Sequence, residues 1–217
     1  MKIFFSKKKL IQTLKCQKNL GFVPTMGAIH RGHVSLIKKS NLLCKLTLVS
    51  IYINKPQFNK KKDYLKYPRT LQKDISILKR SKVDFLYLPS TNEIYPRGTN
   101  KKIRIHAFGK KLCGKYRQKH FESVVDVIDR FIKIIKPDKI FFGNKDMQQL
   151  KIVEEFLKRN KVKTKIIGCK TIRENNGIAY SSRNILLSSN QKNIASKIYK
   201  LICRNKINLI KKKYRLK

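Results

Sequence analysis

The chain has 217 residues, 41% of them hydrophobic, so it is long enough to bury one core with at most a small appendage. This composition excludes an intrinsically disordered chain, and the apolar runs are too short for a membrane-spanning helix. The N-terminus MKIFFSKKK lacks the pattern of a signal peptide, so we expect a cytoplasmic protein.

The formal net charge is +41, from 53 Lys and Arg against 12 Asp and Glu. Such an excess is typical of nucleic-acid-binding proteins. Here, however, the lysines are spread along the whole chain, and Lys, Asn and Ile, whose codons are rich in A and T, are all over-used. We therefore interpret the charge as compositional drift and expect only nonspecific binding to nucleic acid.

The five cysteines stand alone, without a C-x-x-C pair, and their number is odd. This spacing predicts reduced thiols in a reducing compartment, most of them filling the core. A catalytic role for Cys113, which precedes a glycine, is an alternative without further support.

Residues 1–19 are predicted to form a helix or half-helix, and the informative segment follows them. Residues 20–23 are a short apolar run typical of a buried strand, which Pro24 is expected to end. Residues 34–43 have the apolar spacing of a helix. Gly27 and Gly32 allow the backbone between them to turn sharply and to approach a ligand. The segment therefore predicts a strand, a tight turn and a helix whose first turn suits a phosphate.

Two histidines, His30 and His33, lie three residues apart, so they can share one face at the entrance of this helix. Imidazoles beside an anion-binding turn can stabilise charge that develops during phosphoryl or nucleotidyl transfer. Two alternatives stay open for the H-x-G-H pattern alone. The histidines can be ordinary surface residues, or part of a zinc site, although no Cys, Asp or Glu lies nearby to complete the ligands.

The rest of the chain alternates between strands and helices. Strands are predicted at residues 46–53, 83–88, 139–142 and 163–168, an edge strand at 101–107, and helices at 71–80, 121–135, 148–158 and 189–211. Thr70 is expected to cap the helix at 71–80, and residues 59–62 are expected to be a solvated loop. This alternation predicts an α/β fold with a doubly wound parallel sheet, in which the strand ends line the ligand crevice.

Polar residues at the predicted strand ends are candidates for binding. Gln57 follows one strand in NKPQF, and Lys145 and Asp146 follow another in GNKD, where they can serve a phosphate and a ribose or metal. The segment 181–183, SSR, is expected to be a mobile loop with donors for a triphosphate. Arg117 can contact a phosphate as a fork-shaped donor. Taken singly, each of these residues is also compatible with an ordinary loop or surface role.

Four segments then occur in a fixed order: PTMGAIHRGH, NKPQF with YPRT, GNKDMQQL and RENNGIAYSSRN. In this order the chain, from about residue 21 to about residue 188, resembles the pantothenate synthetase (pantoate–β-alanine ligase) family of the HxGH nucleotidylyltransferase superfamily. The resemblance implies a Rossmann-like domain over residues 1–188 that binds nucleotide and pantoate. It also implies that ATP with Mg²⁺ activates pantoate as pantoyl adenylate, releasing pyrophosphate, after which β-alanine displaces AMP to form pantothenate.

The resemblance also assigns the site. His33 and His30 would be catalytic, Gln57 and Gln149 would bind pantoate, and Gln57 would also lie near β-alanine. The ATP-binding residues would be Met26, Gly27, Ala28, Ile29, His30, Arg31, Gly32, His33, Gly143, Asn144, Lys145, Asp146, Ile172, Tyr180, Ser181, Ser182 and Arg183. Arg117 matches a family arginine near the phosphates, and no side chain is assigned to a resident metal.

The sequence departs from the family pattern at several positions. Asn144 replaces a Glu, Asn176 an Asp and Tyr180 a Leu, while Lys55 stands where Pro is usual and RQKHF stands where the family has R-P-G-H-F. None of these changes removes a residue assigned to catalysis.

The larger expected departure is at the end of the chain. Family members carry a further small C-terminal lid domain, and residues 189–217 read as a basic helical remnant of it. Because a lid excludes water from a hydrolysable adenylate, we expect weak or leaky catalysis. The resemblance also implies a homodimer. An inactive remnant of the family and a different nucleotidylyltransferase are the alternatives.

Overall fold

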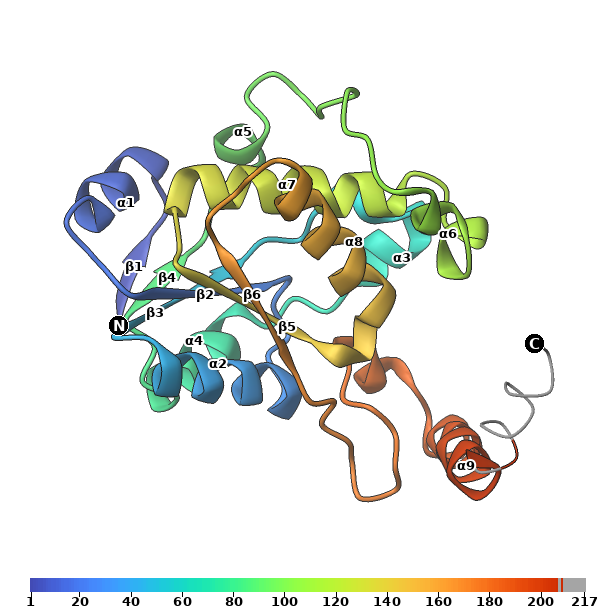
Figure 1. The fold of residues 1–217 in the computed structure, drawn as a ribbon. Helices are drawn as coiled ribbons and strands as arrows, with labels where there is room; N and C mark the ends of the chain where they lie inside the picture. The colour runs from blue at the N-terminus through green and yellow to red at the C-terminus, as the bar shows by residue number, and fades with distance from the viewer. Residues whose placement is uncertain (207, 209–217) are drawn as a thin grey trace.

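The computed structural model describes residues 1–206 and residue 208, and within them six parallel strands form one sheet (Figure 1). The strands are β1 (Lys2–Phe4), β2 (Leu20–Thr25), β3 (Leu46–Ile51), β4 (Phe85–Tyr87), β5 (Lys139–Gly143) and β6 (Lys165–Cys169). Their order in the sheet is β1-β4-β3-β2-β5-β6. The winding therefore reverses between β2 and β5, the switch point at which doubly wound sheets bind ligands. The predicted α/β fold with a doubly wound parallel sheet is confirmed.

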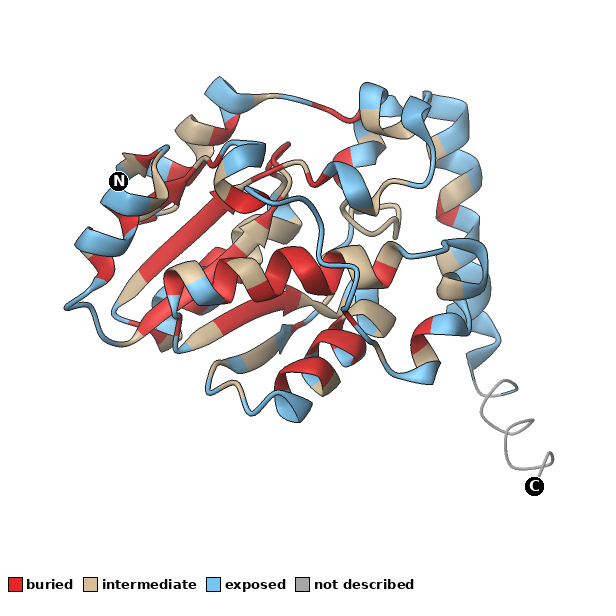
Figure 2. Cartoon of the chain, turned by 90° about the horizontal axis from the view of Figure 1, so that it is seen from above, coloured by how far each residue is buried: buried red, intermediate tan, exposed pale blue. Residues whose placement is uncertain are grey.

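Helices cover both faces of the sheet (Figure 1). On one face lie α1 (Lys7–Leu14), α7 (His120–Ile135) and α8 (Met147–Arg159), and on the other lie α2 (Arg31–Leu43) and α4 (Leu71–Arg80). The other described helices are α3 (Lys61–Lys66), α5 (Thr91–Ile94), α6 (Cys113–Tyr116), α9 (Ser189–Arg204), and the 3-10 helices η1 (Lys55–Gln57), η2 (Ala107–Lys110), η3 (Asn144–Asp146) and η4 (Ser182–Leu186). Figure 2 shows the buried strands enclosed between helices whose outer faces are exposed.

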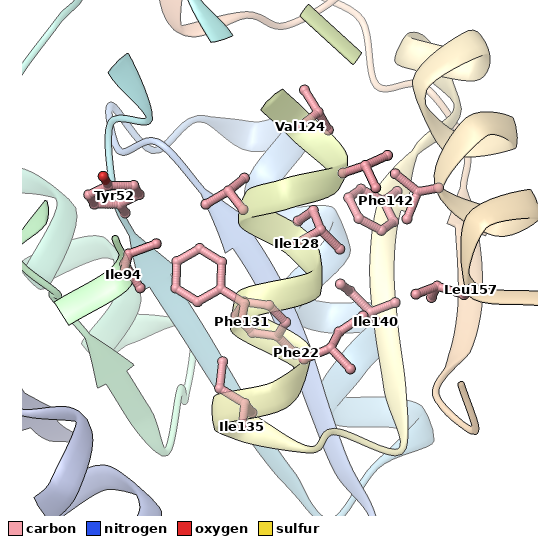
Figure 3. Packing of buried hydrophobic residues seen from close by; sticks show 14 of the residues in the cluster. Phe22, Tyr52, Ile94, Val124, Ile128, Phe131, Ile135, Ile140, Phe142 and Leu157 are labelled. Carbon is pink, nitrogen blue, oxygen red and sulfur yellow. The ribbon is translucent and has the colours of Figure 1, made fainter. Parts of the chain in front are cut away.

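The larger part of the core lies between α7 and the sheet (Figure 3). The ring of Phe131 in α7 packs on Phe22 in β2 with 5.5 Å between ring centroids. Ile128, one turn earlier on α7, is also buried, and it faces the same layer as Ile140 of β5. This apolar face explains why residues 121–135 are recognisable as a helix from sequence, and truncating Phe131 to Ala would destabilise the fold by about 3–5 kcal/mol.

Several local predictions were wrong, including the one that most cysteines fill the core, since Cys16, Cys113 and Cys203 are exposed. The segment 1–19 contains β1 as well as a helix, and β1 pairs with β4 at Lys2 and Phe85. The loop expected at residues 59–62 is helical at its end, because residues 61 and 62 begin the short helix α3 (Lys61–Lys66). Residues 101–107 form no strand, because Ile103 and Ile105 pack against the core beside α7 and α8, away from the sheet edges at β1 and β6.

Strand β2 extends past Pro24 to Thr25 although the proline was expected to end it. Proline has no N–H to donate to a neighbouring strand. The neighbouring β5 is in register with β2 only at Gly21 and Phe22, so Pro24 lies beyond the paired residues on that side. The strand therefore loses no hydrogen bond there, and it carries Thr25 to the edge of the cavity described below.

The last described helix is α9, which begins at Ser189 with a capping box between Ser188 and Gln191. The predicted extension of this helix to residue 211, and with it part of the proposed remnant over residues 189–217, falls on residues 207 and 209–217, which lie outside the described residues. In the part of the chain that the structure describes, no helix is long and apolar enough to cross a membrane.

Candidate active site

A cavity of about 230 Å³ lies at the carboxyl ends of β2 and β5, where the winding of the sheet reverses. Fourteen of the residues predicted from sequence line it: Met26, His30, Gly32, His33, Gln57, Gly143, Lys145, Asp146, Gln149, Ile172, Tyr180, Ser181, Ser182 and Arg183. They come from segments spread over more than 150 positions of the chain, and the fold brings them to one place.

His30 is the N-cap of α2, and its Nδ1 accepts a hydrogen bond from the Gly32 amide at 3.1 Å. A Cβ on Gly32 would lie 2.9 Å from the His30 ring, so glycine is required at this position. Because the amide can only donate, Nδ1 of His30 is unprotonated, and the proton of the neutral ring is on Nε2. The ring of His33 stacks on that of His30 with 3.9 Å between centroids.

Both histidines are neutral at physiological pH. Burial and the nearby Lys145 ammonium lower the pKa of His30 to about 4. Burial, with smaller contributions from His30 and Lys145, lowers the pKa of His33 well below its usual value. The Nδ1 atom of His33 is shielded from solvent and has no hydrogen-bond partner among the described residues. The pair therefore offers neutral hydrogen-bonding groups that need not lose or gain a proton to meet a phosphate.

Positive charge reaches the same cavity from η3, at the end of β5. The Nζ atom of Lys145 lies 3.1 Å from the carboxylate of its neighbour Asp146, and both side chains remain partly exposed. An exposed ion pair of this kind is weak and can exchange partners. Lys145 is thus available to an incoming anion.

The amide of Gln57 is held in one orientation. Its Oε1 accepts from Asn54 Nδ2 at 3.1 Å, and its Nε2 donates to Met26 Sδ at 3.3 Å. Asn54 is buried and is fixed in turn by Tyr95, whose hydroxyl donates to Asn54 Oδ1 at 2.9 Å. The weak sulfur acceptor is easily replaced, so Gln57 presents an N–H donor to the cavity.

The structure also shows what His120 contacts and which of the adjacent residues Gln148 and Gln149 lines the cavity. His120 Nδ1 donates to the Gln57 carbonyl at 2.7 Å and so fixes the backbone of η1. Gln148 uses its amide on the carbonyls of Phe108 and Lys111, outside the cavity. Of the two adjacent glutamines in GNKDMQQL, only Gln149 lines the cavity.

The segment 171–184 folds back on itself through a bridge between Arg173 and Ala179 and ends in η4. The hydroxyl of Ser182 donates to the carbonyls of Gly27 and Ala28, both at 3.2 Å. The guanidinium of Arg183 forms a bidentate ion pair with Asp63 of α3, at 3.0 and 2.9 Å. The segment 181–183, expected to be a mobile loop, is therefore helical from Ser182 on and anchored to two other parts of the site.

Six predicted residues do not line the cavity: Gly27, Ala28, Ile29, Arg31, Asn144 and Arg117. The first three form the turn behind it, and their amides bond to side chains of the protein. The side chain of Asn144 packs against Gly168. Arg117 is exposed on the loop after α6.

Sequence analysis missed the apolar part of the lining. It comes from the buried Tyr52, which directly follows β3, and from four buried residues of α7, namely Val124, Val127, Ile128 and Phe131. Asn54 was also missed, although it stands in the NKPQF segment at the end of a predicted strand. Its role depends on Tyr95, which is 41 positions away in sequence. Among the described residues no cluster of three or more His, Cys, Asp or Glu can hold a metal ion.

The chain is similar to known proteins in both sequence and fold. A family model described as pantoate–β-alanine ligase matches residues 2–215. Pantothenate synthetase from Aquifex aeolicus is 38% identical over 205 residues, which are 92% of this chain and 73% of that protein. The enzyme of the same name from Endomicrobium trichonymphae is 44% identical over 86% of this chain and 66% of its own length. The chain thus spans about two thirds to three quarters of these relatives.

Solved structures give the same result. The chain superposes on pantothenate synthetase from Thermus thermophilus with a TM-score of 0.90 and 32% identity, covering 94% of this chain and 74% of that one. A pantoate–β-alanine ligase from Francisella tularensis, complexed with β-γ ATP and β-alanine, is 40% identical with a TM-score of 0.89, over 92% of this chain and 78% of that one.

Proposed function

The chain belongs to the pantoate–β-alanine ligase family and is an ATP-dependent ligase, and we propose that it joins pantoate to β-alanine through a pantoyl adenylate formed in the cavity at the ends of β2 and β5. The proposal is supported above all by one observation. A neutral histidine pair, a lysine and an oriented glutamine amide line a single cavity.

The nucleotide side of the cavity is the first turn of α2. The Gly32 amide of this turn donates to His30 Nδ1, and the turn lies at the positive end of the helix dipole, which suits the phosphates of ATP. His30 can donate from Nε2, and Lys145 adds a positive charge from η3. Charge that builds up around the α-phosphorus is stabilised by these groups without prior proton transfer.

The acid side of the cavity combines a polar end with an apolar wall. Gln57 presents its Nε2 donor, and Gln149 lines the same space. Val127, Ile128 and Phe131 form an apolar wall that suits the two methyl groups of pantoate. This arrangement favours a small branched hydroxy acid over a second nucleotide, the substrate of the alternative nucleotidylyltransferase.

The reaction then follows in two steps. An oxygen of the pantoate carboxylate attacks the α-phosphorus of ATP, the bond from that phosphorus to the bridging oxygen of pyrophosphate breaks, and pyrophosphate leaves. The neutral amine of β-alanine next attacks the acyl carbon and loses a proton. The bond from the acyl carbon to the AMP oxygen breaks, and AMP leaves with both electrons of that bond.

The experiment measures AMP and pantothenate formed from ATP, pantoate and β-alanine with Mg²⁺, for the wild-type chain and for His33→Ala. We expect both AMP and pantothenate from the wild type. The variant should lose 10²–10³-fold in rate, the size typical of removing one charge-stabilising donor. The matched control is His106→Ala, because His106 caps η2 outside the cavity lining.

Three outcomes would separate the alternatives. AMP without pantothenate would mean that adenylation occurs and that the intermediate is hydrolysed. Neither product, with ATP still bound, would indicate a fold without the chemistry. A His33→Ala variant as active as the His106→Ala control would contradict the role given to His33.

We further propose that Mg²⁺ enters with ATP as part of the substrate and that the chain is a cytoplasmic homodimer. Asp146 is the only acid among the described lining residues and can contact the nucleotide-bound ion. Loss of activity with a chelator, restored by excess Mg²⁺, tests the ion. Sedimentation equilibrium at moderate salt tests the dimer.

A further inference from the structure

Asp74 is a buried acid that the mechanism above does not use. It lies in the first turn of α4 and is 1% exposed. Although the chain carries 53 Lys and Arg, Asp74 forms no ion pair within the described residues. A buried carboxylate without a cation needs strong hydrogen bonds to be tolerated, and those bonds indicate what it does.

The hydrogen bonds of Asp74 go to the turn that precedes His30. Its Oδ2 accepts from the Ala28 amide at 2.9 Å, and its Oδ1 accepts from the Ile29 amide at 2.8 Å. The hydroxyl of Thr70, the residue that precedes α4, donates to Oδ1 at 3.0 Å. One side chain thus holds two successive backbone amides immediately before the histidine pair.

The turn needs such a partner because its backbone is strained. Gly27 has φ +80° and Ala28 has φ +48°, so two successive residues lie in the left-handed region. Glycine adopts this conformation freely, but the Cβ of alanine makes it unfavourable. Hydrogen bonds from outside the turn must therefore offset the unfavourable backbone conformation of Ala28.

Ala28 and Ile29 are buried, but packing around the turn is incomplete on one side. Gly27 and Ala28 line a second cavity of about 400 Å³, together with Thr70 and Asp74, while Met26 lines both cavities. The turn is thus a thin wall between two cavities. Side chains of two other segments hold the turn. Ser182 donates to the Gly27 and Ala28 carbonyls, and Asp74 accepts from the Ala28 and Ile29 amides.

We propose that Asp74 is a positioning residue for the ligase reaction: it holds the strained turn 27–29 in the conformation that sets His30 and His33 at the cavity. The inference rests on the proposed function. In this proposal the backbone amides of Ala28 and Ile29 do not bind phosphate, because both already donate to Asp74.

The first test is Asp74→Asn, which keeps the shape of the side chain but removes its charge and turns an N–H group toward one of the amides. A shift of about 1 Å in reacting groups can lower a rate about 10²-fold. We expect kcat for pantoate-dependent AMP formation to fall about 10–100-fold, with KM for ATP and pantoate changed less than about threefold, because the histidines act on the transition state.

The matched control is Asp126→Asn. Asp126 is also a buried acid, 3% exposed, that accepts from a backbone amide, that of Asn100 at 2.8 Å. Unlike Asp74 it is paired with a cation, Arg130, at 2.7 Å, and it lies on α7 outside the cavity lining. We expect this variant to lower the melting temperature and to leave kcat unchanged at a temperature where it is folded. If Asp74→Asn keeps kcat within twofold of this control, the proposal is overturned.

A second variant separates positioning from stability. In the Asp74→Asn background, Ala28→Gly removes the Cβ that makes φ +48° unfavourable. We expect it to recover kcat at least fivefold over Asp74→Asn alone, whereas no recovery would argue that the turn is not what Asp74 holds.

A third measurement does not depend on activity. Hydrogen exchange of the Ala28 and Ile29 amides, without substrates, should be at least tenfold faster in Asp74→Asn than in the wild type, with the amides of β2 unchanged. If the wild type makes no AMP, the proposed function fails while this measurement still tests the turn. Equal exchange rates in the two proteins would overturn the inference by itself.

Discussion

Two parts of the cavity are held in different ways. The turn 27–29 and the Gln57 amide are fixed by hydrogen bonds from buried residues, Asp74 and Asn54. The phosphate-binding candidates Arg183 and Lys145 instead take part in ion pairs whose side chains are about two-fifths exposed or more. Buried hydrogen bonds to the backbone hold one geometry, whereas exposed ion pairs contribute little and exchange partners readily. The candidate site therefore combines a part that buried hydrogen bonds hold rigid with cations that only exposed ion pairs hold.

The largest effect is expected in the rigid part. Asn54→Ala removes the partner that orients Gln57 and leaves the buried Tyr95 hydroxyl without its acceptor. The unsatisfied hydroxyl should destabilise the fold by about 1–3 kcal/mol. We expect kcat/KM for pantoate to fall about 10–100-fold, because a displaced donor no longer meets the substrate.

Steady-state kinetics and urea unfolding check this prediction. The control is Asn41→Ala, which removes an exposed asparagine whose amide donates to the Ser81 carbonyl outside the cavity lining. Equal pantoate kinetics for the two variants would show that Asn54 does not orient the glutamine.

A smaller effect concerns pH. The pKa of His30 is lowered to about 4 by burial and Lys145, while the same side chain in the unfolded chain titrates near 6.5. Between these values the unfolded chain binds a proton that the folded chain does not, so the free energy of unfolding falls as the pH is lowered from about 6.5 toward 4.

The variant His30→Asn isolates this contribution, since asparagine can still accept from the Gly32 amide but does not titrate. Urea unfolding at pH 7, 6 and 5 should show a steeper loss of stability for the wild type than for the variant. Parallel loss in both proteins would mean that His30 titrates normally in the folded state.

The smallest effect is expected in the part held by exposed ion pairs. Asp63→Asn breaks the bidentate pair with Arg183, in which both side chains are more than 40% exposed. The free energy of unfolding should change by less than about 1 kcal/mol. Because Arg183 is released toward the phosphates, KM for ATP should fall about two- to fivefold, and the difference should shrink at high salt. A raised KM would show that Asp63 positions Arg183 for the nucleotide.

Local sequence patterns predicted the elements that matter most to the site. The strand, turn and helix around His30 and His33 are present, with α2 beginning three residues earlier than its apolar pattern, because its N-terminus is capped by His30. The edge strand β1 was missed, since three residues are too few to show a period. The predicted strand at 101–107 failed because alternating isoleucines also fit a loop packed on the core.

The residues that hold the site together could not be predicted. Asp74 contacts a turn 45 and 46 positions away, and no local pattern distinguishes it from the other acids. Thr70 was predicted as an N-cap and does occupy that position, but its hydroxyl bonds to Asp74 and not to a helix amide. Likewise, only tertiary contacts separate Gln149, which lines the cavity, from Gln148, which anchors the loop after η2.

The central claim is that one cavity brings the pantoate carboxylate to the α-phosphorus of ATP. The most direct test uses pantoate labelled with ¹⁸O in its carboxylate, with unlabelled ATP, β-alanine and Mg²⁺, followed by mass spectrometry of the nucleotide product. Attack on the α-phosphorus and later cleavage of the acyl carbon–oxygen bond predict one ¹⁸O atom in each AMP. Unlabelled AMP, or ADP with the label in inorganic phosphate, would contradict the account.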